Sequence, residues 1–247
     1  MIGDPTDMDE TPRTLGDAAL QSQTLEDVGN AVNYHRWLCD LARPYLGDHP
    51  VELGAGLGDY AGNWLAGGLP RITLCEREEV RYAGLRERFG GDPRVTVTDF
   101  DVYDPPQGEH SAFVAFNVLE HLERDADALR AAHRLLAPGG AVVMFVPAFE
   151  FAMSDFDRAV GHVRRYRKRT LREAYERAGL ELELLHYVNA PGLAAWFAGM
   201  RLLRMTPGDG PLLRVWDGGV VPVARAVERR VRPPFGQSVF AVGRVPR

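Results

Sequence analysis

Two kinds of hydrophobic pattern alternate along the 247-residue chain. Short, almost wholly apolar runs are typical of strands covered on both faces, and stretches with apolar residues at helical spacing are typical of amphipathic helices. A short strand before Gly54 is followed by six further predicted strands, over residues 71–76, 94–98, 111–117, 141–146, 180–188 and 238–242. Helices are predicted between them over residues 59–66, 78–89 and 123–136. Five strand–helix units in series predict an α/β fold with an open parallel sheet, which binds ligands at the carboxyl ends of its strands.

The chain before the first strand has two parts of different composition. Residues 1–23 are acidic and polar and lack the basic start and apolar core of a signal peptide, so we interpret them as a mobile arm that can close over a site. Residues 25–46 carry apolar side chains at helical spacing and predict one amphipathic helix. Two interpretations of Tyr34 and Trp37 are open: they pack in the core, or, with Asn33, they line the substrate side of a site.

A long segment, residues 189–236, separates the sixth predicted strand from the seventh. Its two predicted helices, over residues 193–204 and 212–231, are rich in tryptophan, leucine and valine, yet neither is long and apolar enough to span a membrane. We interpret the segment as a helical insert that extends the packing or forms a homodimer surface. The alternative is a cap that shapes an apolar substrate pocket.

The stretch Val51-Glu52-Leu53-Gly54-Ala55-Gly56-Leu57-Gly58 lies where the first strand turns into a helix. Glycines at such a turn let a ligand approach backbone N–H groups, although ordinary packing of a helix on a strand also favours them. The next strand ends in Glu76, where a doubly wound sheet accepts hydrogen bonds from ribose hydroxyls. The spacing G-x-G-x-G, rather than G-x-G-x-x-G, argues against a dinucleotide.

These motifs resemble those of the class I S-adenosylmethionine-dependent methyltransferases, whose first motif reads E-x-G-x-G-x-G and whose second strand ends in an acid. The segment Asn117-Val118-Leu119-Glu120-His121-Leu122 is similar to the family's loop after strand four, and Leu136-Ala137-Pro138-Gly139-Gly140 is similar to its turn before strand five. The resemblance covers residues 28–188. It implies a Rossmann-like, doubly wound, seven-stranded sheet that is mostly parallel with the last strand antiparallel, in a methyltransferase domain over residues 24–247.

The resemblance also implies that S-adenosyl-L-methionine is the cofactor and gives roles to residues at the strand ends. Glu76 is expected to hold the ribose hydroxyls, and Asp101 with Val102 the adenine, with Asp99 as the rival acid. The implied cofactor-binding residues are Glu52, Gly54, Gly56, Gly58, Glu76, Asp101, Val102 and Asn117.

Polar residues after the fifth strand are the candidates for chemistry on the acceptor. His162 is the first candidate for a base because an imidazole can remove a proton, Tyr166 can orient a nucleophile, and an arginine can hold an anionic group. The catalytic candidates are His162, Tyr166 and His121, and the substrate-binding candidates are Tyr34, Trp37, Pro147, Arg164 and Arg165. The alternative is that residues 161–166 form a solvated rim.

The charge and composition of the chain limit which partners and which cellular location we expect. A net charge of −5 gives no general basic field, so we expect no nucleic-acid partner. Cys39 and Cys75 are too few for a disulfide framework and lack the spacing of metal ligands, so we expect a reducing, cytoplasmic location and no metal site. Lys168 is the only lysine among many arginines, a composition compatible with a high-GC bacterium, where such enzymes tailor specialised metabolites.

The sequence therefore predicts a methyltransferase that acts on an oxygen or nitrogen of a small molecule, which is partly apolar or anionic. Two other classes stay open. A nicotinamide-dependent oxidoreductase would share the sheet and Glu76, and a non-catalytic partner subunit would bind the cofactor without transferring its methyl group.

Overall fold

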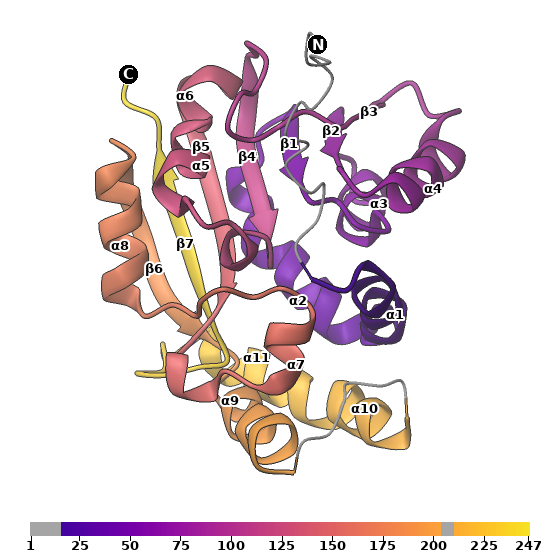
Figure 1. Ribbon diagram of the computed structural model, residues 1–247, viewed down its shortest axis with the longest axis vertical. Coiled ribbons are helices and arrows are strands. Elements are labelled where there is room, and N and C mark those ends of the chain that lie inside the picture. The colour runs from indigo at the N-terminus through magenta and orange to yellow at the C-terminus, as the bar shows by residue number, and fades with distance from the viewer. Residues whose placement is uncertain (1–15, 204–209) are drawn as a thin grey trace, which may run out of the picture.

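A single sheet forms the centre of the computed structural model, which describes residues 16–203 and 210–247 (Figure 1). Its strand order is β3-β2-β1-β4-β5-β7-β6. The strands are β1 (Pro50–Leu53), β2 (Ile72–Cys75), β3 (Val95–Thr98), β4 (His110–Phe116), β5 (Leu136–Pro147), β6 (Glu181–Val188) and β7 (Ser238–Arg244). The pairs among β1 to β5 are parallel, and β7 runs antiparallel between β5 and β6. The predicted Rossmann-like, doubly wound sheet is confirmed.

Helices cover both faces of the sheet, and each face has its own apolar cluster. One cluster joins the sheet to α5 (Asp125–Arg130), α6 (Ala132–Leu135) and α8 (Lys168–Arg177). The other joins it to α2 (Val32–Ala42), α3 (Asp59–Ala66), α4 (Glu79–Phe89) and α11 (Val221–Glu228). Strands covered on both sides must be apolar throughout, which explains why residues 112–116 and 141–146 are all buried.

The chain before β1 forms two helices where one was predicted. The first is α1 (Ala18–Gly29), and it is separated from α2 by Asn30 and Ala31. Gly29 and Asn30 are poor helix formers, and the break is consistent with this weakness. A short 3-10 helix, η1 (Arg43–Tyr45), then carries Pro44 in its first turn. Residues 18–23 of the predicted arm are therefore helical, and residues 1–15 lie outside the described part.

The prediction of one helix over residues 123–136 was also wrong. Two short helices, α5 and α6, occupy this stretch, and β5 already begins at Leu136. The sequence Ala137-Pro138-Gly139-Gly140 extends the strand because it pairs with the end of the chain: Gly139 N–H donates to Val245 O over 3.1 Å, and Val245 N–H donates to Gly140 O over 3.0 Å. A partner more than 100 positions away decides this local structure.

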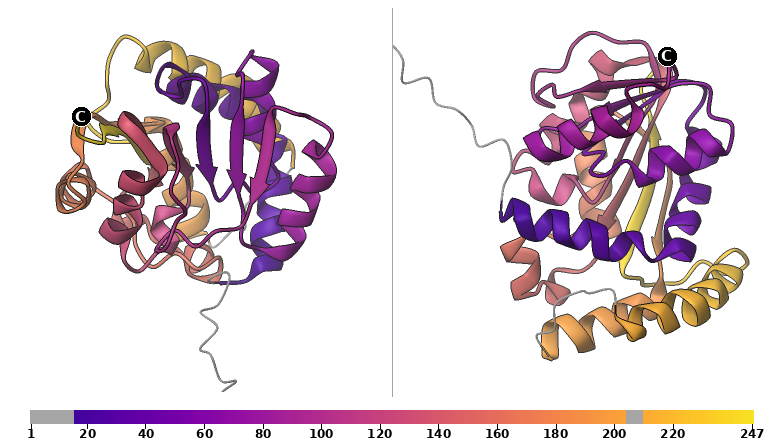
Figure 2. Two further views of the ribbon diagram at one scale, coloured as in Figure 1. Left: turned by 90° about the horizontal axis from the view of Figure 1, so that it is seen from above. Right: turned by 90° about the vertical axis from the view of Figure 1, so that its right-hand side faces the viewer.

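The insert forms a layer of helices beyond the carboxyl end of the sheet, below α1 and α2 (Figure 2). Its elements are α9 (Ala190–Trp196), the π-helix η4 (Phe197–Leu202), α10 (Pro211–Val215), the π-helix η5 (Trp216–Val220) and α11. Arg204, the last residue of the first predicted helix, lies outside the described residues. Within the described ranges, no helix has the length and apolarity needed to cross a bilayer.

Candidate functional site

The glycine turn after β1 has the backbone that its sequence predicts. Gly54, Gly56 and Gly58 have φ of 65°, 56° and 80°, a region that side chains disfavour. A Cβ added at Gly54 would lie 2.5 Å from Val118, and one at Gly58 would lie 2.5 Å from the Phe89 ring. These two glycines are therefore required for packing.

Gly56 has a different neighbour. A Cβ added there would meet only the tip of Leu25 on α1, at 3.1 Å. Its backbone N–H donates to Glu76 Oε2 over 2.9 Å. Gly56 is thus the one position of the three where the turn is open to something other than the sheet and its helices.

Glu76 lies at the end of β2 and is 5% exposed. Its second oxygen, Oε1, accepts a hydrogen bond from Glu78 N–H over 2.9 Å and lies 3.5 Å from Arg81 Nη2. The carboxylate is therefore fixed beside Gly56, and its charge is balanced by a buried guanidinium. A preorganised acceptor next to the glycine turn is what recognition of ribose hydroxyls needs.

The acids after β3 differ in how they are held. Asp101 Oδ1 accepts from Tyr103 N–H over 2.8 Å, and its Oδ2 lies 3.0 Å from Arg77 Nη1. Val102 beside it is buried, whereas Asp99 is exposed. Arg77 follows Glu76 directly, so the pair with Asp101 joins the ends of β2 and β3.

Two other predicted cofactor residues flank the turn. Glu52 is 3% exposed, its Oε2 has no hydrogen-bond partner among the described residues, and burial raises its pKa well above the ordinary value. Asn117 directly follows β4 and has φ of 54°, an unusual conformation that is enriched at functional sites. Its side chain is exposed.

Helix α1 bridges the two sides of the carboxyl edge. Arg81 Nη1 donates to Ser22 Oγ over 3.2 Å, which ties α1 to the β2 side. Asp17 N–H donates to Ala159 O over 2.9 Å, which ties its start to the segment before His162. The end of the predicted arm therefore contacts both the cofactor-side and the acceptor-side loops.

Asp157 organises the segment that carries His162. Asp157 belongs to α7 (Asp155–Ala159) and is fully buried. Its Oδ1 accepts from His162 Nδ1 over 2.9 Å and from Arg165 Nη2 over 2.7 Å, and its Oδ2 accepts from Ser154 Oγ over 2.7 Å. Burial opposes its charge, but the hydrogen bond from His162 and the charge of Arg165 prevail and hold its pKa below the ordinary value.

The hydrogen bond that His162 Nδ1 donates to Asp157 leaves the other ring nitrogen of His162 directed at the segment after β4. His162 Nε2 lies 3.8 Å from Glu120 Oε1, and the His162 and His121 rings are 4.6 Å apart. Glu120 is fully buried, burial raises its pKa to about 7, and neither of its oxygens has a hydrogen-bond partner among the described residues. Burial lowers the pKa of His121 to about 3.

A potential metal-ligand set therefore exists where the sequence predicted none. One ligand atom each from Glu120, His121 and His162 lie within 4.8 Å of one another. About 40 positions separate the Glu-His pair from His162, and only the sheet brings them together. The histidines were recognised from the sequence as candidates for chemistry, but Glu120 was not.

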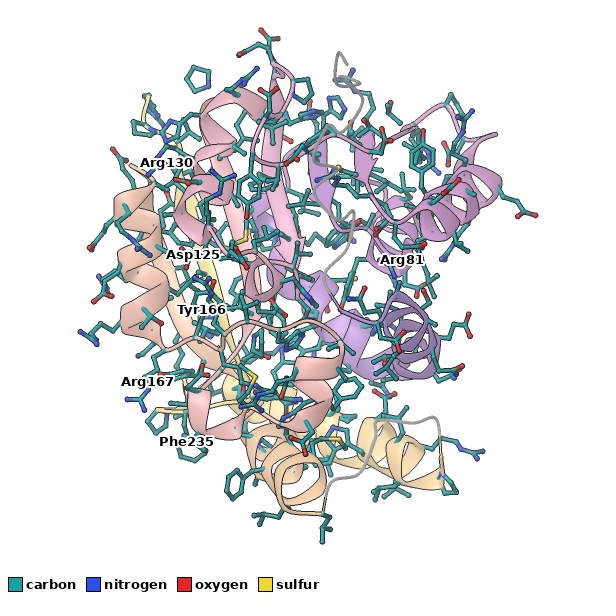
Figure 3. All side chains as sticks on the ribbon, viewed as in Figure 1. Arg81, Asp125, Arg130, Tyr166, Arg167 and Phe235 are labelled. Atoms are coloured by element: carbon teal, nitrogen blue, oxygen red, sulfur yellow. The ribbon has the colours of Figure 1, made fainter. Side chains whose placement is uncertain are left out.

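The structure does not support catalytic or substrate-binding roles for Arg164, Arg165 and Tyr166, which follow His162. Tyr166 is 1% exposed, and its hydroxyl donates to Leu119 O and to Asp125 Oδ2 over 3.4 and 3.3 Å, so it is a core residue next to Asp125 (Figure 3). Arg164 pairs with Asp125 at 3.1 Å. Arg165 is the buried partner of Asp157.

The remaining substrate candidates have mixed positions. Pro147 is buried at the end of β5, where its carbonyl accepts from Tyr166 N–H over 2.8 Å. Trp37 is 3% exposed inside the cluster that joins α2 to the sheet, which favours the predicted alternative of core packing. Tyr34 is half-buried, and its hydroxyl lies beside Ser238 and Asn189.

The fold and the glycine turn define a Rossmann-like protein that binds a nucleotide-type ligand at the carboxyl edge of its sheet. A model of the methyltransferase domain family matches residues 50–185, more than half of the chain. A probable S-adenosylmethionine-dependent methyltransferase of Mycolicibacterium smegmatis is 29% identical over 164 residues. These cover 62% of this chain and 60% of that protein, so the chain spans less than two thirds of its curated relative.

Solved structures share the fold at low identity. A putative methyltransferase in complex with the Haloferax volcanii Trm112 methyltransferase activator has 17% identity and a TM-score of 0.63, with 93% of this chain and 94% of that chain covered. The [4+2]-cyclase SpnF has 22% identity and a TM-score of 0.55, with 86% and 80% covered. Geranyl diphosphate C-methyltransferase of Streptomyces coelicolor A3(2) has 15% identity and a TM-score of 0.59, with 84% and 74% covered.

This chain belongs to the methyltransferase domain family and is of the class I, S-adenosylmethionine-dependent kind. The residues present fit that cofactor. Gly56 leaves its backbone accessible apart from one leucine tip, and Glu76 is a fixed, buried acceptor beside it. The expectations of the family and of its cofactor are confirmed, whereas the roles of the individual residues stay predictions.

Proposed function

We propose that the protein transfers a methyl group from S-adenosylmethionine to an oxygen or nitrogen of a small molecule, and that this reaction tailors a specialised metabolite. The observation that carries the proposal is the hydrogen-bonded pair of the partly buried His162 and the buried Asp157 beside the segment after β4. An imidazole held by a carboxylate is suited to removing a proton from a heteroatom.

In this proposal, different residues bind the parts of the cofactor and assist the reaction. Glu76, Asp101 and Val102 would hold the adenosine part, and Gly56 and Asn117 the amino-acid part. S-adenosylmethionine supplies an electrophilic methyl group when bound. His162 assists removal of the acceptor proton, and such assistance contributes about 10²–10⁴-fold. Positioning and exclusion of water supply the rest.

The acceptor is expected to have an apolar part. Five aromatic side chains lie close together between the loop after β5 and the first insert helices, and Phe151 among them is 52% exposed. The Phe149–Phe151 and Phe151–Phe197 ring centroids are 5.3 and 5.8 Å apart, and Phe156 lies 6.0 Å from Trp196. Because Arg164 and Arg165 are already paired, their binding of an anionic group on the acceptor has less support.

The test is His162→Ala, with His133→Gln as a matched control. His133 bonds Ala178 O on the α8 side of the sheet, remote from the candidate site. Formation of S-adenosylhomocysteine is followed with panels of phenols, amines and carboxylic acids. We expect turnover of the true acceptor to fall by about 10²-fold or more in His162→Ala. Calorimetric affinity for S-adenosylhomocysteine should stay within about threefold.

Three outcomes would overturn parts of the proposal. Full turnover in His162→Ala would mean that proximity alone suffices and that His162 is a rim residue. Methylation at carbon, the reaction named for the Streptomyces neighbour, would change the acceptor class. Cofactor binding without transfer to any acceptor would indicate a non-catalytic partner subunit.

We propose that the insert, residues 189–236, shapes the acceptor side and forms a homodimer surface. Trp196 Nε1 donates to Ala152 O over 3.2 Å, so the insert contacts the loop after β5. Several apolar side chains on the insert are more than half exposed: Leu202, Leu203, Leu212, Val215, Val223 and Val227. Sedimentation of the wild type and of Leu212→Glu would test the dimer.

A further inference from the structure

The proposed methyl transfer does not explain why the carboxyl group of Glu120 is buried. It is fully buried, and both carboxylate oxygens lack a hydrogen-bond partner among the described residues. An unpaired buried carboxylate is strongly unfavourable, and so is an unpaired neutral acid, which would have a buried hydroxyl without an acceptor. His162 Nε2 is 3.8 Å from Oε1, which is too far for a hydrogen bond.

We propose that Glu120, His121 and His162 bind one divalent transition-metal ion. Their ligand atoms already lie within 4.8 Å of one another. Metal–ligand distances of about 2.0–2.2 Å place ligands about 3–4 Å apart, so small side-chain rotations close the site. A bound cation would pair both Glu120 oxygens and use the ring nitrogens that face it.

The surrounding residues have the arrangement of an outer coordination shell. His162 Nδ1 is bonded to Asp157 over 2.9 Å, which fixes the ring and directs Nε2 toward Glu120. Metal-bound histidines almost always donate their other N–H to a carboxylate or carbonyl in this way. Val163 N–H donates to Glu120 O over 2.9 Å and joins the two segments that carry the ligands.

The ligand set selects the class of ion. Two imidazoles and one carboxylate suit Zn²⁺, Mn²⁺, Fe²⁺ or Co²⁺, whereas Ca²⁺ and Mg²⁺ prefer oxygen ligands alone. Three protein ligands leave positions open for a water molecule or a substrate atom.

The role of the ion rests on the proposed function. An acceptor hydroxyl bound at an open position would lose its proton to solvent at a lower pH, since a bound cation stabilises the oxyanion. The oxygen would then form the new O–C bond while the C–S bond breaks and its electron pair returns to sulfur. With the ion bound, Nε2 of His162 would be a metal ligand, and the residue would assist loss of the acceptor proton through the ion; direct proton removal by His162, as in the proposed function, applies to the metal-free protein.

Binding of the ion is tested without any acceptor. Protein stripped with a chelator is titrated calorimetrically with Zn²⁺, and Co²⁺ is added separately to record its visible absorption, which reports the coordination geometry of the bound ion. We expect one ion per chain for the wild type and for the His133→Gln control. Loss of an outer-shell partner typically weakens a site about 10–100-fold, so Glu120→Gln, His121→Gln and His162→Gln should each lose more than this.

Affinity for S-adenosylhomocysteine, measured on every variant, shows which of them are folded. The site would be refuted if the wild type binds no ion. It would also be refuted if the ligand variants bind Zn²⁺ with the same affinity as the His133→Gln control. A protein that binds the ion through these residues but transfers no methyl group would refute the proposed function alone. An acceptor turned over equally with and without the ion would refute only the catalytic role.

Discussion

Asp157→Asn tests whether a buried ionic network holds the segment that carries His162. The Asp157 side chain is fully buried and accepts hydrogen bonds from Arg165, His162 and Ser154. Asparagine has almost the same shape but no charge. The Arg165 guanidinium, in a side chain only 2% exposed, would then lose its counter-charge.

The magnitude follows from that burial. Removing one partner of a buried ion pair costs about 3–5 kcal/mol, because the remaining charge is left uncompensated. For a protein of this size, each kcal/mol lowers the thermal midpoint by about 2–4 °C. We therefore expect the midpoint of Asp157→Asn to fall by about 6–20 °C.

Urea unfolding followed by circular dichroism, together with calorimetric melting, gives the free energy of unfolding. Glu173→Gln is the control, since Glu173 forms an exposed ion pair with Arg169 on α8. Such pairs contribute less than about 1 kcal/mol. If Asp157→Asn loses no more stability than Glu173→Gln, the buried network does not hold this segment and the orientation inferred for His162 has no support.

Three further predictions concern the cofactor side and the helices before β1. Glu76→Gln should weaken S-adenosylhomocysteine by about 1.5–3 kcal/mol in calorimetry, as for hydrogen bonds to a charged group; unchanged affinity would remove its ribose role. Gly58→Ala should lower the free energy of unfolding in urea far more than Gly56→Ala, because the Cβ at position 58 would lie 2.5 Å from Phe89. Gly56→Ala should mainly weaken cofactor binding. Equal losses of stability in the two variants would contradict this prediction. Burial lowers the pKa of His35 in the folded protein. Below about pH 6.5 the unfolded chain therefore binds protons more readily than the folded protein. The free energy of unfolding should decrease as the pH is lowered, by at most about 1.4 kcal/mol per pH unit. Melting curves of His35→Gln should show a shallower pH dependence, and an unchanged slope would refute the assignment.

The sequence predicted the parts of the fold that local patterns specify. Runs such as residues 141–146 are apolar because both sheet faces are covered, and that pattern is visible without a structure. The glycine turn was equally visible, because Gly54, Gly56 and Gly58 all need positive φ. Glu76 was found from its distance to that turn.

What the sequence did not reveal depends on partners far along the chain. Residues 137–140 look like a turn, yet they extend β5 through hydrogen bonds to Val245. Tyr166 and Arg165 look like a functional cluster with His162, but the fold directs them toward Asp125 and Asp157. Polar character alone cannot distinguish a catalytic group from a buried structural one.

The attachment of the insert is another such long-range feature. Asp217, in η5, is 6% exposed, and its carboxylate accepts hydrogen bonds from the backbone N–H groups of Asn33 and Tyr34 over 3.0 and 2.9 Å. These N–H groups lie at the start of α2, where no residue of the helix can accept them. An acid 184 positions away therefore caps the helix and joins the insert to the domain.

Asp217→Ala should accordingly destabilise the protein by about 2 kcal/mol, because it removes a cap and leaves two partly buried N–H donors without an acceptor. It should also speed proteolysis within residues 210–228, since the insert would lose a bond to α2. Asp40→Ala is the matched control: Asp40 also joins α2 to the insert, through Arg225, but it is 43% exposed and should cost less than about 1 kcal/mol. Equal stability and equal cleavage rates in the two variants would show that Asp217 does not anchor the insert, and that apolar contacts such as those of Val221 hold it in place.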